Sequence, residues 1–516
     1  MKNFKKALNM EQGNQKNLMK STRGITLIAL VITVIVMLIL AGVAISVLTD
    51  DGGLFEKTRG AAEAYENSAE KEAKQIDDLM NSIDQYIAGI PVSTKPKTDG
   101  SWNGKVNTPN TSKLPSETTK YVTWSTDGQY REILSDKPLN DWYDYQNGRW
   151  ANIKTTNEDS NLEAYWVWIP RFAYKLPEST TAKKIDIIFI EGNGRTGANG
   201  EICYYSTDTQ ITSDGSGLYS KKTSTALQEW IIHPAFTFGD EQLSGIWVAK
   251  FEASNKNGKV QIKAGETGWT TMNLATAFDA CRNIQTDGGA LGTNVPITTE
   301  NIDINSHMMK NMEWGAVSIL SQSEYGIFNP SSANNTGSVE TTLVWYNTSA
   351  QTGCSTEKST GGSNVYEYNT EYGVKASTTG TIYGVYDMAR GSRAGEYVMG
   401  LMATSTTSGV PSLSSTGFSI LPDSKYYDLY KYGTTYYGTT ITDRSLIGDA
   451  IGELVLSLSS KTWHDQYVCF LFYSSSWNYR SVFSRGSYSG IFAFGANNGS
   501  ADDWGATSFR PTLIVN

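Results

Sequence analysis

GITLIALVITVIVMLILAGVAISVL, from Gly24 to Leu48, is an uncharged stretch that divides the chain into a short leader and a long remainder. As an α-helix it would be ~36 Å long, enough to cross a hydrocarbon core of ~30 Å with some tilt. A soluble helix of this length would carry a polar stripe, and this stretch has none. The sequence therefore predicts a transmembrane helix over residues 25–48, with a buried core helix as the alternative.

The charges on either side of this stretch predict its orientation. Six basic residues precede it, with only Glu11 against them, and acidic residues follow it directly, at Asp50, Asp51 and Glu56. By the positive-inside rule, residues 1–24 stay in the cytoplasm and the chain beyond residue 50 lies outside the cell membrane. We expect a single-pass protein of the cell membrane with its larger part at the cell surface. A cleavable secretory signal is the alternative, since small residues follow the apolar core.

Arg23-Gly24 followed by Ile25-Thr26-Leu27-Ile28 joins the basic leader to the apolar stretch. This arrangement resembles a prepilin-type leader. The resemblance implies that a prepilin peptidase cuts between Gly24 and Ile25 on the cytoplasmic side, and that the helix remains as an anchor or filament core. In that family the mature chain usually begins with Phe or Met and has Glu at its fifth position, where this chain has Ile25 and Ala29. The family's glutamate helps subunits to join a filament. Because this chain has Ala29 in its place, the resemblance supports cleavage more directly than polymerisation.

Residues 50–88 are predicted to form an amphipathic stalk helix, because apolar side chains recur there at steps of three and four residues. Gly89-Ile90-Pro91 would end this helix. Its apolar stripe could pack on the head, and we favour a stalk through which copies self-associate. Residues 89–120 are rich in Thr, Ser, Lys and Pro, which predicts a linker.

Composition limits what the remaining residues can be. The chain has 516 residues, of which 39% are hydrophobic, and its 14 Trp and 29 Tyr can build a sizeable core. A net charge of −9 argues against nucleic acid as a partner, because a basic surface is needed to offset phosphates. The cysteines lie far apart and lack metal-ligand spacing, which favours buried thiols, with one or two disulfides as the alternative. They are Cys203, Cys281, Cys354 and Cys469.

From Tyr121 onward, short aromatic and β-branched runs alternate with Gly, Asn and Asp. Runs such as YVTW, YWVWI, IDIIFI, GIWVAKFEA and PTLIV predict many short strands. Residues 272–284 and 307–325 have a helical pattern instead. The expected fold is therefore α+β, with a β-rich extracytoplasmic head over residues 121–516.

Four segments of the head carry a second resemblance and occur in matching order. They are MMKNMEWGAVSIL with Glu313-Trp314, YGVYDMA (383–389) followed by EYV (396–398), SRGSY (484–488) and SFRP (508–511). Each is similar to a segment of the formylglycine-generating-enzyme group of C-type-lectin-like folds. The resemblance implies a compact α+β domain in which two helices flank a twisted antiparallel sheet with long irregular loops.

Catalysis is a separate question from the fold. Oxidase members of that group depend on two cysteines a few residues apart near the C-terminal end, which hold copper. This chain has only Cys469 there, so the soft-ligand site for copper would be incomplete. We expect no enzymatic activity and no cofactor, and an extracellular oxidase is the less favoured alternative.

Other chemical motifs in the head have structural interpretations. His233, His307 and His464 are isolated, which favours structural roles over metal ligation. Residues 192–197 spell GxGxxG after an apolar run, but no amphipathic helix follows, so we predict a loop and no dinucleotide site. The sequence therefore supplies no candidate catalytic or metal-binding residue.

Aromatic residues alternate with Ser, Asn, Asp and Gly between residues 473 and 504. Tyr and Trp give large contact areas at low entropic cost, and short polar residues adapt their hydrogen bonds, which is typical of a recognition surface. The expected ligand is an extracellular protein or a glycan. A glycine-rich meander with core aromatics is the alternative, for Phe492 and Phe494 above all. The predicted binding residues are Trp477, Tyr479, Tyr488, Phe492, Phe494, Asn497, Asn498, Asp503 and Trp504.

The position of this segment also resembles the variable C-terminal segment of proteins diversified by retroelements, which use the same lectin-like fold. In that comparison Arg485-Gly486 and Phe509-Arg510 would be fixed framework. The EPN and WND triplets of calcium-dependent lectins are absent, and we interpret Asp502-Asp503 as a solvated turn, with a hard-cation site formed together with Asn497 and Asn498 as the alternative. The sequence thus predicts a membrane-anchored bacterial surface protein with a ligand-binding lectin-like head. A minor pilin-like subunit of a surface filament or secretion pseudopilus is the alternative.

Overall fold

The chain divides into two compact units, Met1–Pro91 and Val92–Asn516. The computed structural model describes only residues of the second unit, beginning at residue 108. The gaps in that description are 126–129, 176–183, 206–210, 214–218, 222–229, 287, 293–294, 296–302, 334–343, 357–363, 392–394, 404–406, 408, 412, 414, 431–445, 452, 454–481, 487–489, 492, 498 and 501–506. The predicted leader, transmembrane helix and stalk lie outside the described residues. Within those residues, no helix has the length and apolarity that a membrane crossing requires.

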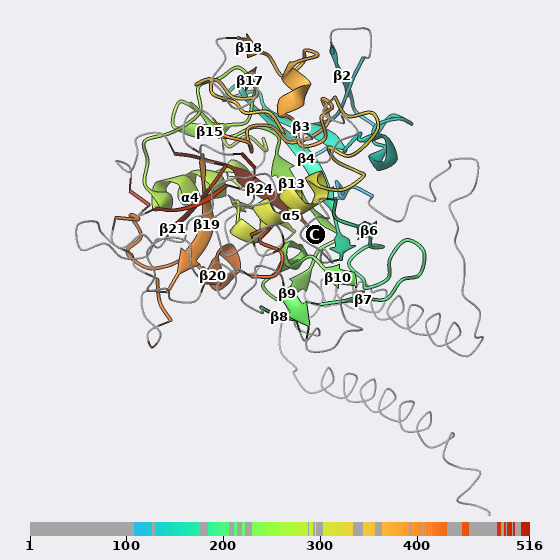
Figure 1. Ribbon diagram of the computed structural model, residues 1–516. Coiled ribbons are helices and arrows are strands. Elements are labelled where there is room, and N and C mark those ends of the chain that lie inside the picture. Colours follow the sequence, from blue (N-terminus) through green and yellow to red (C-terminus); the bar gives the residue numbers. More distant parts are fainter. Residues whose placement is uncertain are drawn as a thin grey trace, which may run out of the picture. The chain divides into compact units, whose positions relative to one another are not determined.

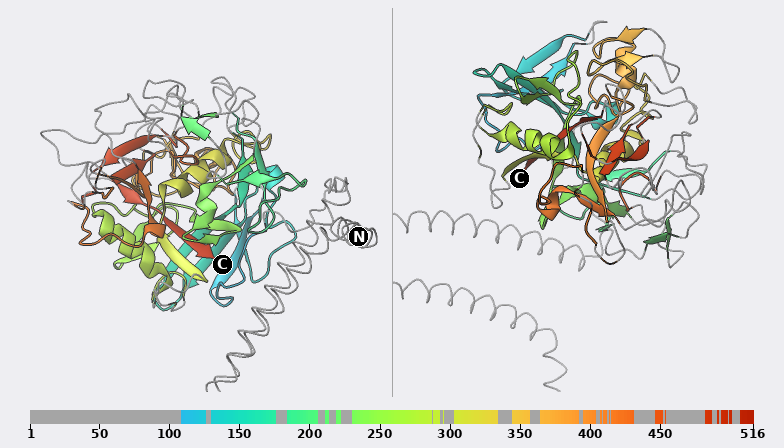
Figure 2. Two further views of the ribbon diagram at one scale, coloured as in Figure 1. Left: turned by 90° about the horizontal axis from the view of Figure 1, so that it is seen from below. Right: turned by 90° about the vertical axis from the view of Figure 1, so that its left-hand side faces the viewer.

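The largest sheet unites the two ends of the head. Its seven strands run in the order β16-β24-β13-β4-β3-β1-β2, and all neighbours are antiparallel. The last strand, β24, therefore lies between β16 and β13, which come from much earlier in the chain (Figure 1). Two further views show the same arrangement (Figure 2). The strands are β1 (Thr119–Trp124), β2 (Glu132–Ser135), β3 (Asn152–Asn157), β4 (Leu162–Pro170), β13 (Gly245–Ala249), β16 (Ile304–Met308) and β24 (Pro511–Val515).

A second sheet of five strands follows the order β20-β19-β21-β22, and β23 pairs in parallel with Glu396 and Tyr397 at the start of β19. All seven residues of β19 are buried, because its two edges and both faces are covered. A single residue, Arg510, separates β23 from β24 and so links this sheet to the largest one. The strands are β19 (Glu396–Met402), β20 (Asp428–Tyr430), β21 (Val482–Arg485), β22 (Phe494–Asn497) and β23 (Ser508–Phe509).

A four-stranded sheet, β6-β5-β10-β7, and four two-stranded pairs complete the β-structure of the described residues. The GxGxxG segment precedes β7 and forms bridges from Ile190 to Gly197 and from Thr196 to Ile202, which confirms a loop. The remaining strands are β5 (Phe172–Tyr174), β6 (Ile187–Phe189), β7 (Cys203–Tyr204), β8 (Ile211–Ser213), β9 (Tyr219–Lys221), β10 (Trp230–Ile232), β11 (Thr237–Phe238), β12 (Glu241–Gln242), β14 (Ser254–Lys256), β15 (Lys259–Gln261), β17 (Ser355–Thr356) and β18 (Val365–Tyr366).

The two α-helices of the described region are α4 (Leu274–Arg282) and α5 (Asn311–Ser321). Asn273 caps α4 by accepting from the Thr276 amide at 2.9 Å, so the helix predicted at 272–284 is confirmed with slightly shorter bounds. The helix predicted at 307–325 is wrong at its start, because His307 and Met308 belong to β16 and pair with β24. Helix α5, drawn in yellow near the middle of Figure 1, is buried at every residue.

The described region is thus β-rich with few helices, which confirms the α+β class. One main core runs through it and contains five fully buried tryptophans, Trp150, Trp166, Trp168, Trp247 and Trp314. Cys203, Cys281 and Cys354 are buried free thiols, in line with their sequence interpretation, and Cys469 lies outside the described residues. Contacts with the core begin before β1, since the Trp247 indole donates to the Asn110 carbonyl at 2.8 Å.

Candidate binding site

Most of the predicted binding residues lie outside the described residues. Phe494 and Asn497 are described only as the two ends of strand β22. The predicted cleavage position, Gly24 and Ile25, also lies outside. The structure therefore describes mainly the residues that hold the candidate segment, residues 473–504, in place. The undescribed binding residues are Trp477, Tyr479, Tyr488, Phe492, Asn498, Asp503 and Trp504.

Strands β21 and β22 form an antiparallel pair within the candidate segment. Val482 lies opposite Asn497, and Arg485 lies opposite Phe494. The Gly486 amide donates to the Ala493 carbonyl at 3.1 Å, which closes the connection between the two strands. All four residues of β21 are buried. This pairing fixes the positions of Gly486 and Ala493, the residues on either side of 487–492 in the sequence.

Arg485 anchors the end of β21 from inside the protein. Its Nη1 donates to Asn311 Oδ1 at 3.0 Å and to the Asp449 carbonyl at 2.8 Å, and its side chain is fully buried. Burial lowers the pKa of this guanidinium to about 10, against the opposing charge of Asp449. The predicted framework residue is therefore held by helix α5 and by the segment around Asp449.

Gly486 follows Arg485 and takes a backbone conformation that other residues avoid. Its φ is +70°, and a Cβ there would lie 2.5 Å from the Met388 carbonyl oxygen and 3.3 Å from the Trp314 ring. Only glycine fits both the dihedral and the space. Position 486, directly after β21, therefore accepts only glycine.

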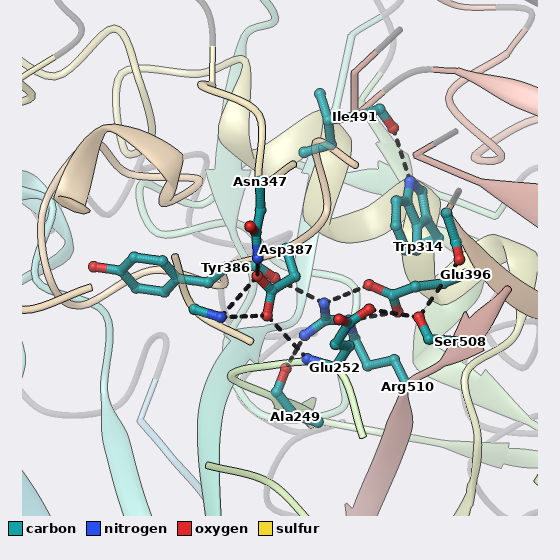
Figure 3. A network of polar contacts seen from close by, with 12 residues as sticks. Ala249, Glu252, Trp314, Asn347, Tyr386, Asp387, Glu396, Ile491, Ser508 and Arg510 are labelled. Carbon is teal, nitrogen blue, oxygen red and sulfur yellow. Dashed lines mark hydrogen bonds and ion pairs between the residues drawn. The ribbon is translucent and has the colours of Figure 1, made fainter. Parts of the chain in front are cut away.

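Three further contacts fix the backbone of the candidate segment. The Trp314 indole donates to the Ile491 carbonyl at 2.9 Å, as Figure 3 shows. The Tyr397 hydroxyl donates to the Ser500 carbonyl at 3.0 Å, and the Leu274 amide donates to the Gly499 carbonyl at 3.0 Å. Helix α5, strand β19 and helix α4 therefore each hold one point of this segment.

Arg510 follows the candidate segment, residues 473–504, and makes four hydrogen bonds (Figure 3). Its Nε and Nη2 donate to the two carboxylate oxygens of Glu396 at 3.0 and 2.6 Å. Its Nη1 donates to the Ala249 carbonyl at 2.6 Å, and its Nη2 also donates to the Tyr386 carbonyl at 2.7 Å. Arg510 and Glu396 are both fully buried. This pairing joins β19, β13 and the junction of β23 with β24.

Two more buried carboxylates lie beside this ion pair. Asp387 accepts from the Gly353 amide at 2.8 Å and from Asn347 Nδ2 at 2.8 Å, and Ser508 Oγ donates to Glu252 Oε2. Burial raises the pKa of Asp387, and it raises that of Glu396 to about 7, although the Arg510 charge acts in the opposite direction for both. Across the described residues, no group of three or more His, Cys, Asp or Glu side chains could hold a metal ion. This cluster of Glu252, Asp387, Glu396 and Arg510 links segments that are far apart in the sequence.

The two described histidines contact protein groups. His233 is fully buried, and its Nδ1 accepts from the Ala235 amide at 3.2 Å, while burial lowers its pKa to about 3. His307 Nε2 lies 2.9 Å from Glu313 Oε1. Both fit the structural role that the sequence predicted, and His464 lies outside the described residues.

Sequence reasoning missed several residues that position the candidate segment. Asn311, which binds Arg485, and Tyr397, which binds the Ser500 carbonyl, were not singled out as individual residues. Tyr397 stands within the EYV motif and Asn311 within MMKNMEWGAVSIL, so the neighbourhood of each carried a signal, but neither motif pointed to the residue itself. In comparison with known proteins, the chain matches no protein-family model and no curated protein.

Proposed function

We propose that this chain is a membrane-anchored surface protein whose head binds an extracellular protein or glycan through residues 473–504. The observation that carries the proposal is the spacing of the buried anchors. Arg485, Ile491, Gly499 and Ser508 are each held by core contacts, and seven of the nine predicted binding residues, from Tyr488 to Trp504, fall between these fixed points in the sequence. Rigid anchors on either side hold ligand-contacting residues in fixed positions, which is typical of binding loops on a rigid scaffold.

The proposed head is a C-type-lectin-like domain of the formylglycine-generating-enzyme type. The support is that motif residues far apart in the sequence meet in one buried region. Arg510 of the last motif binds Glu396 and the Tyr386 carbonyl of the second motif. The guanidinium of Arg485 in the third motif lies 6.0 Å from the ring of Trp314 in the first. Contacts among the four motifs are expected if all four belong to the framework of one domain.

We propose binding in preference to catalysis. The charged motif residues direct their side chains at one another and at backbone groups in the interior, where a substrate cannot reach them. The predicted leader and stalk would place the head outside the cell membrane. A minor pilin-like subunit is the second candidate function, and the prepilin-type junction at Gly24-Ile25 favours it.

The direct test uses the full chain in detergent micelles, with intact cells of the source population and arrays of purified glycans as probes. We expect Trp477→Ala combined with Tyr479→Ala to weaken binding by ~30-fold or more, because the loss of even one aromatic hot-spot residue costs ~2 kcal/mol, which is ~30-fold. Tyr372→Ala is the matched control, since Tyr372 is 45% exposed and outside the segment. Equal binding by both variants would contradict the proposal.

A second test addresses diversification of the segment. The codons for residues 470–516 would be sequenced across many cells of the source population. Diversity at positions such as Tyr479, Tyr488 and Asp503, with Arg485 and Arg510 fixed, is the expected result. Uniform codons would point to one fixed ligand or to a structural cap. Cleavage after Gly24 together with recovery of the chain in filaments would favour the pilin-like candidate.

A further inference from the structure

A buried lysine and a buried aspartate face each other where helix α5 meets strand β20. Lys310 directly precedes α5, and Asp428 is the first residue of β20. Lys310 Nζ lies 4.0 Å from Asp428 Oδ1, and the two side chains are only 7% and 10% exposed. Burial of such an ion pair carries a desolvation penalty that the mutual attraction offsets only in part.

The surroundings of this pair are aromatic. Lys310 Nζ lies 5.8 Å from the centre of the Phe238 ring. Phe238 also stacks on His307 at 5.1 Å and contacts Tyr426 edge-on at 5.4 Å. Aromatic faces attract the ammonium but replace little of its hydration, so burial of the ion pair has a desolvation cost.

The Asp428 carboxyl is oriented by the first turn of helix α5. Its Oδ2 accepts from the Met312 amide at 2.7 Å, and the Asn311 backbone also contributes a hydrogen bond. The other oxygen, Oδ1, faces Lys310. Burial raises the pKa of Asp428 to about 6, against the charge of Lys310 and these backbone donors. The carboxyl therefore takes up a proton more readily than an exposed aspartate does.

We propose that Lys310 and Asp428 join in an intramolecular isopeptide bond. Once Nζ and Oδ1 close from 4.0 Å to hydrogen-bond distance, a proton passes from the Lys310 ammonium to Oδ1, and the free amine attacks Cγ of Asp428. Negative charge then develops on Oδ2, which the amides at the start of α5 stabilise as they would an oxyanion. The Cγ–Oδ1 bond breaks and Oδ1 leaves as water with a second amine proton. An ammonium and a carboxylate thus give one amide and one water, with no oxidant or cofactor.

The product would replace a buried ion pair by a neutral amide, which removes the cost of desolvating two charges. It would also link two elements that flank the same strand. Lys310 forms a bridge with Met399 of β19, and Asp428 pairs with Gly400 of β19. The bond would therefore lock the start of α5 to β20 beside the strand that supports the candidate binding segment.

The chain contains a matched pair that should not react. Lys154 Nζ lies only 2.9 Å from Glu163 Oε1, closer than in the Lys310 pair. Glu163 is 26% exposed and also pairs with Lys263 at 2.9 Å. Its lysine partners outweigh its partial burial and lower its pKa, so this carboxylate stays ionised and solvated. Distance alone therefore does not select the reactive pair.

The test is peptide mapping of the full chain after denaturation and trypsin digestion. We expect a branched peptide that joins residues 283–358 to residues 426–431, with a mass about 18 Da below the sum of the two, since one water is lost. Residues 154 and 163 should appear in unlinked peptides. Recovery of residues 426–431 as a free peptide, with cleavage after Lys310, would overturn the proposal.

Two variants assign the bond to these residues. Lys310→Arg keeps the positive charge but removes the nucleophilic amine, and Asp428→Ala removes the carboxyl. Both should abolish the branched peptide. A branched peptide that persists in Asp428→Ala would overturn the assignment. The mapping of the unsubstituted chain gives its answer even if either variant fails to fold.

Discussion

Arg510 and Glu396 form a bidentate ion pair in the interior of the head, and neither side chain is exposed. Arg510 Nε lies 3.0 Å from Glu396 Oε2, and Nη2 lies 2.6 Å from Oε1. Arg510 stands between the two main sheets along the chain, and Glu396 opens the central strand of the smaller one. A pair in this position couples the two sheets. Its stabilising effect depends on both partners, because a lone charge in the same place has no water to solvate it.

Glu396→Met should therefore destabilise the full chain by about 3–5 kcal/mol, the usual cost of leaving one member of a buried pair uncompensated. The double variant Glu396→Met with Arg510→Met should lose less than the sum of the two single substitutions. Some loss remains, because the Ala249 and Tyr386 carbonyls lose their donor. Urea unfolding followed by tryptophan fluorescence measures all four proteins. Additive losses would show that the two charges do not depend on each other.

Gly486→Ala should destabilise the head more than an ordinary glycine substitution does. Gly486 and Gly258 both have positive φ, +70° and +77°, but only Gly486 has no room for a Cβ, whereas nothing lies within 4 Å of the Cβ position at Gly258. We expect Gly258→Ala to cost about 1 kcal/mol for the dihedral and Gly486→Ala to cost about 1–3 kcal/mol more. Thermal unfolding of the two variants gives the difference. Equal melting temperatures would mean that the Met388 carbonyl moves away freely.

Local sequence patterns predicted the class of this fold and one helix well. Runs such as YWVWI carry β-branched and aromatic residues, and they became strand β4. The helical pattern at residues 307–325 misled, because its first residues pair with Thr512 and Pro511 about two hundred residues later. Such a partner lies outside any local window, so tertiary pairing overrode the local pattern there.

The framework of the candidate site could be predicted only in part. Arg485-Gly486 and Phe509-Arg510 were expected as fixed positions, and Arg485, Phe509 and Arg510 are fully buried. Asn311 gave no such signal, because its role depends on Arg485, which reaches it from a distant strand. Side-chain pairings of this kind become visible only when the chain is folded.

The three described cysteines should resist alkylation in the folded chain. Burial raises the pKa of Cys203 to about 12 and that of Cys354 to about 11, and it raises the Cys281 pKa well above its ordinary range. The thiolate is the reactive form, so little of it is present near neutral pH. Iodoacetamide treatment before and after denaturation, read by peptide mass spectrometry, should label these residues only in the denatured chain. Labelling of Cys281 in the native chain would contradict its burial.

The Glu453 carboxyl should make the stability of the head depend on pH in an unusual direction. Its Oε1 accepts from the Tyr174 hydroxyl at 2.8 Å and from the Gly448 amide. Burial, reinforced by the charge of Asp449, nevertheless raises its pKa to about 8. Between its ordinary pKa and this value, the folded chain holds a proton that the unfolded chain has released. The stabilising contribution is therefore fully present at low pH and is lost as pH rises through this window.

Glu453→Gln keeps the shape of the side chain and removes the titration, so it isolates this contribution. From about pH 5 to about pH 8.5, the free energy of unfolding of the original chain should fall relative to that of the variant by on the order of 2–4 kcal/mol. Glu163→Gln is the control, because the pKa of Glu163 is lowered and its carboxylate is ionised across the whole range. The difference for that variant should stay flat. A flat difference for Glu453→Gln as well would show that the Glu453 carboxyl is already ionised at pH 5, as it would be in water, and that its hydrogen bonds to Tyr174 and Gly448 outweigh its burial.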